Sequence, residues 1–188
     1  MTPASLLAPT YVQMLGALSQ WLGKAESQLS PGEADALLSA RLASDMFPLS
    51  TQIRFACVQA HEGMFRLAGE DFPPSVEALL TAGRSADEHP GTIADAKACI
   101  DETVALVQSM SECTGTDNPE RPIAHTLPMG IVFDFTAEQY ARDWAIGQFY
   151  FHVMTAYAIL RSQGIDLGKA DYVAHLFPYA RPGTLPQG

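Results

Sequence analysis

The residues best suited to chemistry lie in the segment 148–161, QFYFHVMTAYAILR, which carries one histidine, His152, among mostly apolar residues. A helix that is apolar almost all round is normally buried in a protein interior. An imidazole that is buried without hydrogen-bond partners costs free energy, so His152 is expected to have partners, a functional role, or both. His152 is therefore either a core histidine that bonds its neighbours or the centre of a site, where it is the one plausible general base.

Three other polar residues are candidates to join His152. Gln148 precedes it by four residues, so the two side chains share one face of the predicted helix. Gln52 lies beside the apolar stripe of an earlier predicted helix and is placed to face the interior. Asp45 precedes that helix, where it caps the first turn or lies near the cap. We expect His152, Gln148, Gln52 and Asp45 to be the ligand-binding residues of a small polar pocket.

The remaining histidines do not suggest a second site. His61 is expected on the surface of the second long helix, His89 and His125 in loops, and His175 in the C-terminal tail. No two of the histidines have the spacing of zinc ligands, and no phosphate-binding loop or nucleophile elbow is present in the sequence. The sequence therefore predicts neither a metal site nor a set of catalytic residues.

Composition limits the partners of this chain. Its 188 residues fit one domain, 1–188, and carry 21 acidic against 11 basic side chains, for a net charge of −10. This charge argues against broad electrostatic binding of nucleic acid or of an anionic membrane. No apolar run reaches the roughly 18 residues that a membrane-spanning helix needs, and the N-terminus does not resemble a signal peptide. Three widely spaced cysteines, Cys57, Cys99 and Cys113, suit a reducing compartment, so a cytoplasmic protein is expected.

The elements that must position these side chains are four long helices. Apolar residues recur three and four positions apart over about 5–29, 48–69, 92–110 and 136–163. Capping signals, including Thr136 with Gln139, mark their first turns, and glycines at 69 and 164 mark two of their ends. Shorter helices are predicted over about 31–40 and 75–80, and residues from about 168 to 188 form a tail. The fold class is therefore all-α, a four-helix bundle with short extra helices.

A long irregular segment, 112–135, separates the third and fourth predicted long helices. Within it apolar residues alternate with period two from Ile123 to Leu127 and again from Met129 to Phe135. This alternation indicates extended structure and favours a small hairpin that turns across residues 128–130.

Three segments resemble a bacterial family of unknown function, in the same order and at the same spacing. They are Asp45-Met-Phe-Pro-Leu49, the run from Phe149 to Arg161, and Gly168-Lys-x-Asp171-Tyr172. That family is similar in fold to the DinB/YfiT-like bundles. The resemblance covers nearly the whole chain and implies a DinB-like four-helix bundle that is commonly a homodimer. It implies no established activity.

The wider DinB-like superfamily often holds a divalent metal with three histidines, one on the second helix and two, four residues apart, on the last. By resemblance, the last of these corresponds to His152, the one before it to Gln148, and the second-helix histidine to Gln52. A side-chain amide is a much weaker metal ligand than a neutral imidazole. We therefore expect no metal or other cofactor, and keep a divalent metal as an alternative.

Three functions are consistent with these observations. The first is a metal-free, homodimeric DinB-like bundle whose polar pocket around His152 binds a small molecule. If this bundle is catalytic, the superfamily analogy is thiol-dependent transfer or hydrolysis. The second is a non-catalytic homodimeric interaction module. The third is a divalent-metal-dependent transferase or hydrolase with ligands such as Asp45 and His152.

Overall fold

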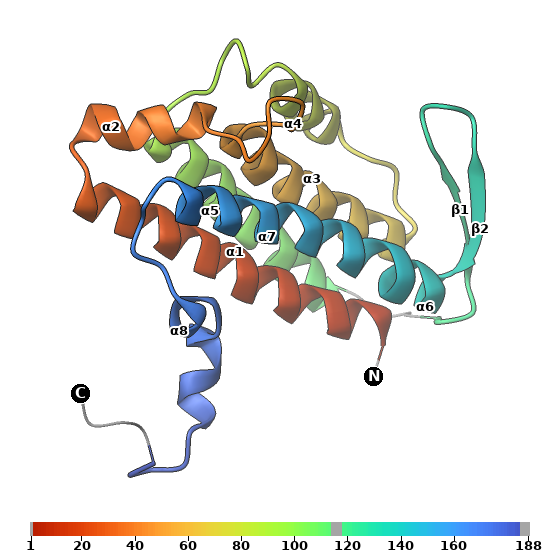
Figure 1. Cartoon of the computed structure of the whole chain (residues 1–188). Coiled ribbons are helices and arrows are strands. Elements are labelled where there is room, and N and C mark those ends of the chain that lie inside the picture. Colours follow the sequence, from red (N-terminus) through yellow and green to blue (C-terminus); the bar gives the residue numbers. More distant parts are fainter. Residues whose placement is uncertain (1, 114–117, 185–188) are drawn as a thin grey trace.

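A computed structural model describes residues 2–113 and 118–184 and has the all-α architecture that the sequence predicts. Four long helical segments lie side by side (Figure 1). They are α1 (Pro3–Gln28), α3 (Leu49–Ala68), α5 (Ile93–Cys113) and a last segment that runs from α6 (Ala137–Gln139) through the turn η2 (Tyr140–Ala145) into α7 (Ile146–Ser162). Helix α3 packs against α1, α5 and α7, so it holds a central position in the bundle.

The helix ends are explained by local sequence. The Thr136 hydroxyl accepts a hydrogen bond from the Gln139 amide at 3.2 Å, and the Gln139 side chain accepts one from the Thr136 amide at 2.9 Å. This capping box begins α6 as predicted. Helix α3 begins at Leu49, with Pro48 as its N-cap. Gly69 ends α3 with φ +74°, a backbone conformation that glycine adopts without steric cost.

Shorter elements cover the ends and edges of the bundle. Helix α2 (Pro31–Ala36) and the single turn η1 (Leu37–Ser39) come after α1, and α4 (Pro74–Arg84) packs against α3. Helix α4 is longer than the 75–80 segment predicted from sequence, because its periodic pattern continues to Arg84.

The segment before the last helix contains the predicted hairpin. Strands β1 (Pro122–Thr126) and β2 (Val132–Thr136) pair antiparallel, and Ile123 lies opposite Phe135. The turn spans residues 127–131, where the Leu127 amide donates to the Ile131 carbonyl. Ile123 and His125 are buried, because side chains two residues apart on a strand share a face. The hairpin stands at the end of the bundle where α3 stops and α6 begins (Figure 1).

The beginning of the C-terminal tail docks on α1. The indole of Trp21 donates a hydrogen bond to the Asp171 carbonyl at 3.3 Å, and Lys24 forms a 2.8 Å ion pair with the Asp171 carboxylate. The Tyr172 ring stacks on the buried Trp21 ring, with 6.4 Å between centroids. These residues lie in α8 (Lys169–Tyr172), and η3 (Ala174–Tyr179) comes directly after it.

The last helix is interrupted by one feature that the sequence does not predict. Residues Tyr140–Ala145 form a π-helical turn, η2. A π turn accommodates one more residue than an α-helical turn and so rotates the rest of the helix by about 100°. The regular spacing of Tyr140, Phe151 and Met154 therefore does not keep them on one face. Tyr140 is fully buried, whereas Phe151 is 59% and Met154 is 38% exposed.

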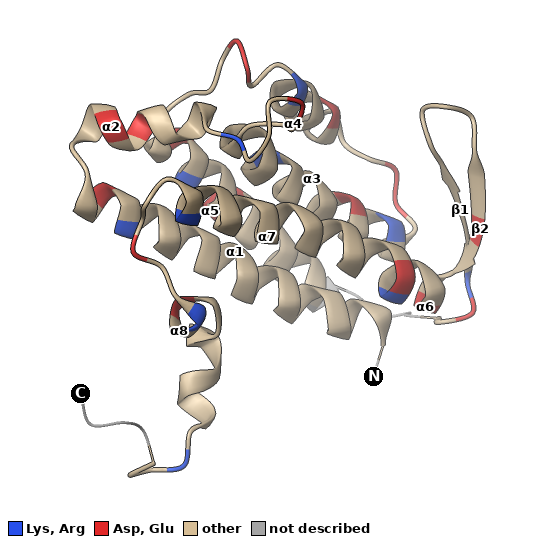
Figure 2. Ribbon diagram, in the orientation of Figure 1, with Lys and Arg blue, Asp and Glu red and all other residues tan. Residues whose placement is uncertain are grey.

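Charges are unevenly distributed over the surface. Figure 2 shows helix α7 almost without charged residues, and its sequence contains a single one, Arg161. Within the described residues, no helix is long and apolar enough to cross a membrane. Cys57 is buried and Cys99 is half-buried, both as free thiols, and the side chain of Cys113 lies outside the described residues.

Candidate functional site

Gln52 and His152 meet where the first turn of α3 packs against the middle of α7. The His152 Nδ1 atom lies 2.9 Å from the Gln52 Oε1 atom. The Gln52 side chain is buried, and its amide nitrogen donates to the Phe47 carbonyl at 3.2 Å. These two bonds fix the amide orientation. Because the amide oxygen can only accept, the proton of the neutral imidazole is on Nδ1.

This tautomer leaves the lone pair of His152 on Nε2. Nε2 makes no hydrogen bond to any residue that the structure describes. It is not among the fully buried polar atoms that lack partners, so it reaches the protein surface. The pair therefore presents one hydrogen-bond acceptor outward, held in place by a buried amide.

Two aromatic rings lie against the His152 ring. The His152 ring lies edge-on to Phe55 at 5.4 Å and to Phe151 at 5.3 Å between centroids, and Phe55 contacts Phe47 at 5.6 Å. Phe47 and Phe151 are 48% and 59% exposed. Burial of the imidazole lowers the pKa of His152 to about 4. His152 is therefore neutral at physiological pH.

The other two predicted site residues occupy different positions. Gln148 is half-buried one helical turn before His152, and its side chain forms no hydrogen bond with the described part of the chain. Asp45 is exposed in the turn that precedes α3, and among the described residues no hydrogen bond or ion pair joins it to His152 or Gln52. The structure thus brings Gln52 to His152, keeps Gln148 on the same helix, and leaves Asp45 at the surface.

The donor set at His152 does not fit the three-histidine metal site of the wider DinB-like superfamily. One imidazole nitrogen is available, and the Gln52 oxygen already accepts a hydrogen bond from the same ring. Amides are weak ligands for the divalent metals that imidazole binds. Within the described residues, no group of three or more His, Cys, Asp or Glu side chains could hold a metal ion.

Two histidines lie in places that differ from the sequence predictions. His61, predicted on the surface, is 8% exposed, and its Nε2–H donates to the Thr103 hydroxyl at 3.2 Å. That direction is required because the hydroxyl itself donates to the Cys99 carbonyl at 2.8 Å. His125, predicted in a loop, is 5% exposed on strand β1. The alternation of Ile123 and His125 is the signal that could have placed it on the buried face.

His125 belongs to a second polar region. Its ring lies 4.4 Å from that of Trp144 and 5.8 Å from that of Tyr140, both in the turn η2. Burial, with a smaller contribution from the Arg66 charge, lowers the pKa of His125 to about 4. Arg66 lies near the end of α3, more than three helical turns after Gln52, so this region lies at the other end of α3 from the His152–Gln52 pair.

Comparison with known proteins agrees with this architecture. A family model described as a domain of unknown function (DUF1993) matches residues 5–173. The solved structure of a DinB family member protein from Shewanella denitrificans is 30% identical, with a TM-score of 0.71, and the alignment covers 97% of this chain and 95% of that chain. No curated protein matches the sequence. Because the family model spans most of the chain, the chain belongs to the DUF1993 family and has a DinB-like fold.

Proposed function

We propose that this DinB-like protein binds a small molecule at the His152–Gln52 pair, and that the ligand carries a hydrogen-bond donor next to an apolar group. The observation that supports this proposal is the hydrogen bond from His152 Nδ1 to Gln52 Oε1, which directs the Nε2 lone pair outward. The aromatic rings of Phe55 and Phe151 beside it would contact the apolar part of the ligand. Gln148, one turn away, would supply a second polar contact.

Binding is favoured over proton transfer by the electrostatics of His152. A general base works best when its pKa lies near the working pH. With a pKa of about 4, the imidazole of His152 accepts a hydrogen bond readily but removes a proton weakly at neutral pH. Thiol-dependent transfer or hydrolysis at this residue would require a ligand or partner that raises this pKa.

The proposal is tested with two probes that differ in one donor. Phenol carries an O–H group beside an aromatic ring, and anisole replaces that hydrogen with a methyl group. We expect the wild-type protein to bind phenol several-fold and up to about tenfold more tightly than anisole, the difference that one hydrogen bond makes. Binding is measured by NMR titration of uniformly ¹⁵N-labelled protein from the shifts of backbone amide signals, and in the wild type phenol should also shift the Nε2 signal of His152.

His152→Leu is the decisive variant, and His89→Leu is its control, because His89 is exposed in a loop. The preference for phenol should disappear in His152→Leu and persist in His89→Leu. Equal binding of phenol and anisole by the wild-type protein would contradict the proposal, as would a preference that survives His152→Leu.

A homodimeric interaction module is the second candidate, and the exposed apolar residues around the site favour it. Phe151 and Met154 lie one turn apart on the outer face of α7, and Phe47 is exposed just before α3. Large exposed apolar residues that cluster together often mark an interface. We expect Phe151→Glu to convert a dimer to a monomer, measured by light scattering after size-exclusion chromatography. A wild-type protein that is monomeric at high concentration would exclude this candidate.

A further inference from the structure

Buried polar atoms without partners gather near the end of α3, away from His152. Five such side-chain atoms belong to this region of the described residues: Tyr11 Oη, Arg66 Nε, Trp144 Nε1, and both ring nitrogens of His125. They come from four elements, namely α1, α3, η2 and β1. Buried polar atoms in native proteins nearly always have hydrogen-bond partners. A concentration of exceptions needs an explanation, and ordered water or a bound group would each supply the missing partners.

The elements around this region place these atoms close together. A Cβ atom added at Gly63 would collide with the hydroxyl of Tyr11, so Tyr11 lies directly against α3 one turn before Arg66. Burial raises the pKa of Tyr11, and the neighbouring Tyr140 in η2 and Glu62 raise it further. The ring of Trp144 contacts His125 from the same π-helical turn. Such turns occur frequently at functional sites.

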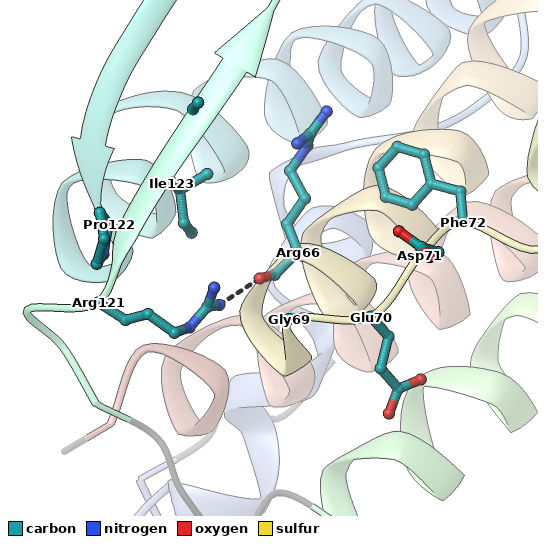
Figure 3. A pocket seen from close by; sticks show the side chains of 9 residues that line it. Arg66, Gly69, Glu70, Asp71, Phe72, Arg121, Pro122 and Ile123 are labelled. Carbon is teal, nitrogen blue, oxygen red and sulfur yellow. Dashed lines mark hydrogen bonds between the residues drawn. The ribbon is translucent and has the colours of Figure 1, made fainter.

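A pocket opens beside Arg66, which is the member of this group that lines it. It has a volume of about 370 Å³ and lies between the end of α3, the segment 69–72 and strand β1 (Figure 3). The Arg66 side chain extends between β1 and Phe72, and its guanidinium lies 4.9 Å from the centre of the Phe72 ring. Ile123 lines the pocket from β1, two residues before His125 on the same buried face.

The charge of Arg66 has no carboxylate partner within ion-pairing distance among the described residues. Its Nε atom is fully buried and makes no hydrogen bond. The second arginine of the pocket, Arg121, donates to the carbonyls of Arg66 and Leu67 at the end of α3, and its charge remains at the pocket wall. Glu62 lies one turn before Arg66 on α3; burial raises the pKa of its carboxyl, and the Arg66 charge opposes this rise. The two guanidinium groups of Arg66 and Arg121 at the pocket wall create a local preference for an anion.

The unpartnered atoms are mainly donors. The Arg66 Nε–H and the Trp144 indole N–H can only donate, the Tyr11 hydroxyl can donate, and neutral His125 has one N–H group. Acceptor oxygens, from ordered water or from a bound group, would satisfy them. Two acidic residues, Glu70 and Asp71, also line the pocket, but both are exposed to water, and the Glu70 carboxylate points away from Arg66 (Figure 3).

We propose that this pocket is a second ligand site, which binds the carboxylate or phosphate group of a small molecule through Arg66. The oxyanion pairs with the Arg66 guanidinium, and its oxygens accept hydrogen bonds from the N–H groups of Arg66 and Arg121, the two arginines that line the pocket. Strand β1 forms one wall of the site. This site does not include His152. Its test is therefore independent of the test of ligand binding at the His152–Gln52 pair.

The test uses the indole signal of Trp144 in the intact protein. The chain has two tryptophans, so ¹H–¹⁵N NMR gives two indole N–H signals, and Trp144→Phe assigns them. Sodium phosphate and sodium acetate are titrated separately, with sodium chloride keeping the ionic strength constant. We expect a saturable shift of the Trp144 signal with at least one anion at concentrations up to about 20 mM. The anion that binds more tightly identifies the ligand group as a phosphate or a carboxylate.

Two arginine variants decide the outcome. Arg66→Met should weaken binding by about tenfold or more, because the cation is lost. Arg142→Met is the matched control, since it removes the same charge from an exposed residue of η2, and it should leave binding within about twofold. Thermal unfolding confirms that both variants are folded. Arg66→Lys keeps the positive charge but lacks the planar guanidinium group, so its anion affinity should lie between those of the wild type and Arg66→Met. The proposal is overturned if neither anion shifts the wild-type signal, or if Arg66→Met responds as the wild type does.

Discussion

At the beginning of α3, the Gln52 amide oxygen accepts a hydrogen bond from the Nδ1–H group of His152, whereas near the other end of α3 neither nitrogen of His125 has a partner among the described residues. Burial lowers the pKa of both imidazoles to about 4, so the protonation of the two histidines is the same at neutral pH. The difference lies in the hydrogen bonds. A partner fixes the tautomer of His152, while His125 remains free to present a donor or an acceptor to whatever occupies the space beside it. Similar pKa values can thus accompany opposite states of hydrogen bonding.

The largest expected effect is the response of stability to acid, which both histidines share. Well above pH 6.5, at about pH 8, the two imidazoles are neutral in the folded and unfolded chain. Between pH 6.5 and about 4 the two histidines bind protons in the unfolded chain but remain neutral in the folded chain. The free energy of unfolding therefore falls as pH decreases. The loss amounts to as much as about 3 kcal/mol for each histidine. Urea unfolding at a series of pH values measures it.

The leucine variants assign this loss to its sources. His152→Leu and His125→Leu should each remove a large part of the acid-dependent loss between pH 6.5 and 4, and His61, whose pKa burial also lowers, contributes to the remainder. His89→Leu, at an exposed position, should change it little. If either buried-site variant retains the full pH dependence of the wild type, that histidine is not the group whose protonation destabilises the fold.

At about pH 8, where imidazole charge plays no part, the same leucine variants should have opposite signs. His152→Leu leaves the buried Gln52 oxygen without a partner and should lower the free energy of unfolding by about 1 to 3 kcal/mol. His125→Leu removes two unpartnered nitrogens and should raise it by about 1 to 2 kcal/mol in buffer without phosphate or carboxylates. Equal destabilisation by both would mean that water or another group already satisfies His125.

The smallest expected effect concerns Tyr11, whose buried hydroxyl lacks a partner among the described residues. Tyr11→Phe removes this hydroxyl and keeps the ring that packs on Phe149 at 4.6 Å. The free energy of unfolding should rise by less than about 1 kcal/mol. Tyr157→Phe, which changes a half-buried ring at the other end of the bundle, serves as the comparison in the same urea experiment. A clear loss of stability with Tyr11→Phe alone would show that the hydroxyl is hydrogen-bonded in solution.

Much of the fold could be predicted because its signals are local. The capping box at Thr136, the terminating glycine at 69 and the alternation around Ile123 each depend on a few neighbouring residues, and the structure confirms each. The π turn at Tyr140 could not be predicted, because no residue type there specifies it. The turn packs against α1 and α3, so its surroundings belong to the tertiary structure and are not encoded in neighbouring residues.

The candidate site could be predicted only in part, for the same reason. Gln52 and His152 are one hundred residues apart in the chain. The prediction that they meet depended on the resemblance to bundles that have a histidine at both positions. Asp45 is close in sequence to α3, but the turn that holds it leaves it exposed to solvent. Arg66 and Trp144 carry no sequence signal, because a lone cation and a lone indole become informative only when their partners are seen to be missing.

The π turn at Tyr140–Ala145 also has a consequence for how the protein can vary. In a regular α-helix, the side chains of Tyr140 and Phe151 would point within about 20° of the same direction. If one of them were buried in the bundle, the other would be buried as well. One extra residue removes that constraint. A deletion of a single residue here would therefore rotate α7 by about 100° relative to the start of the helix and change which of its side chains face the bundle.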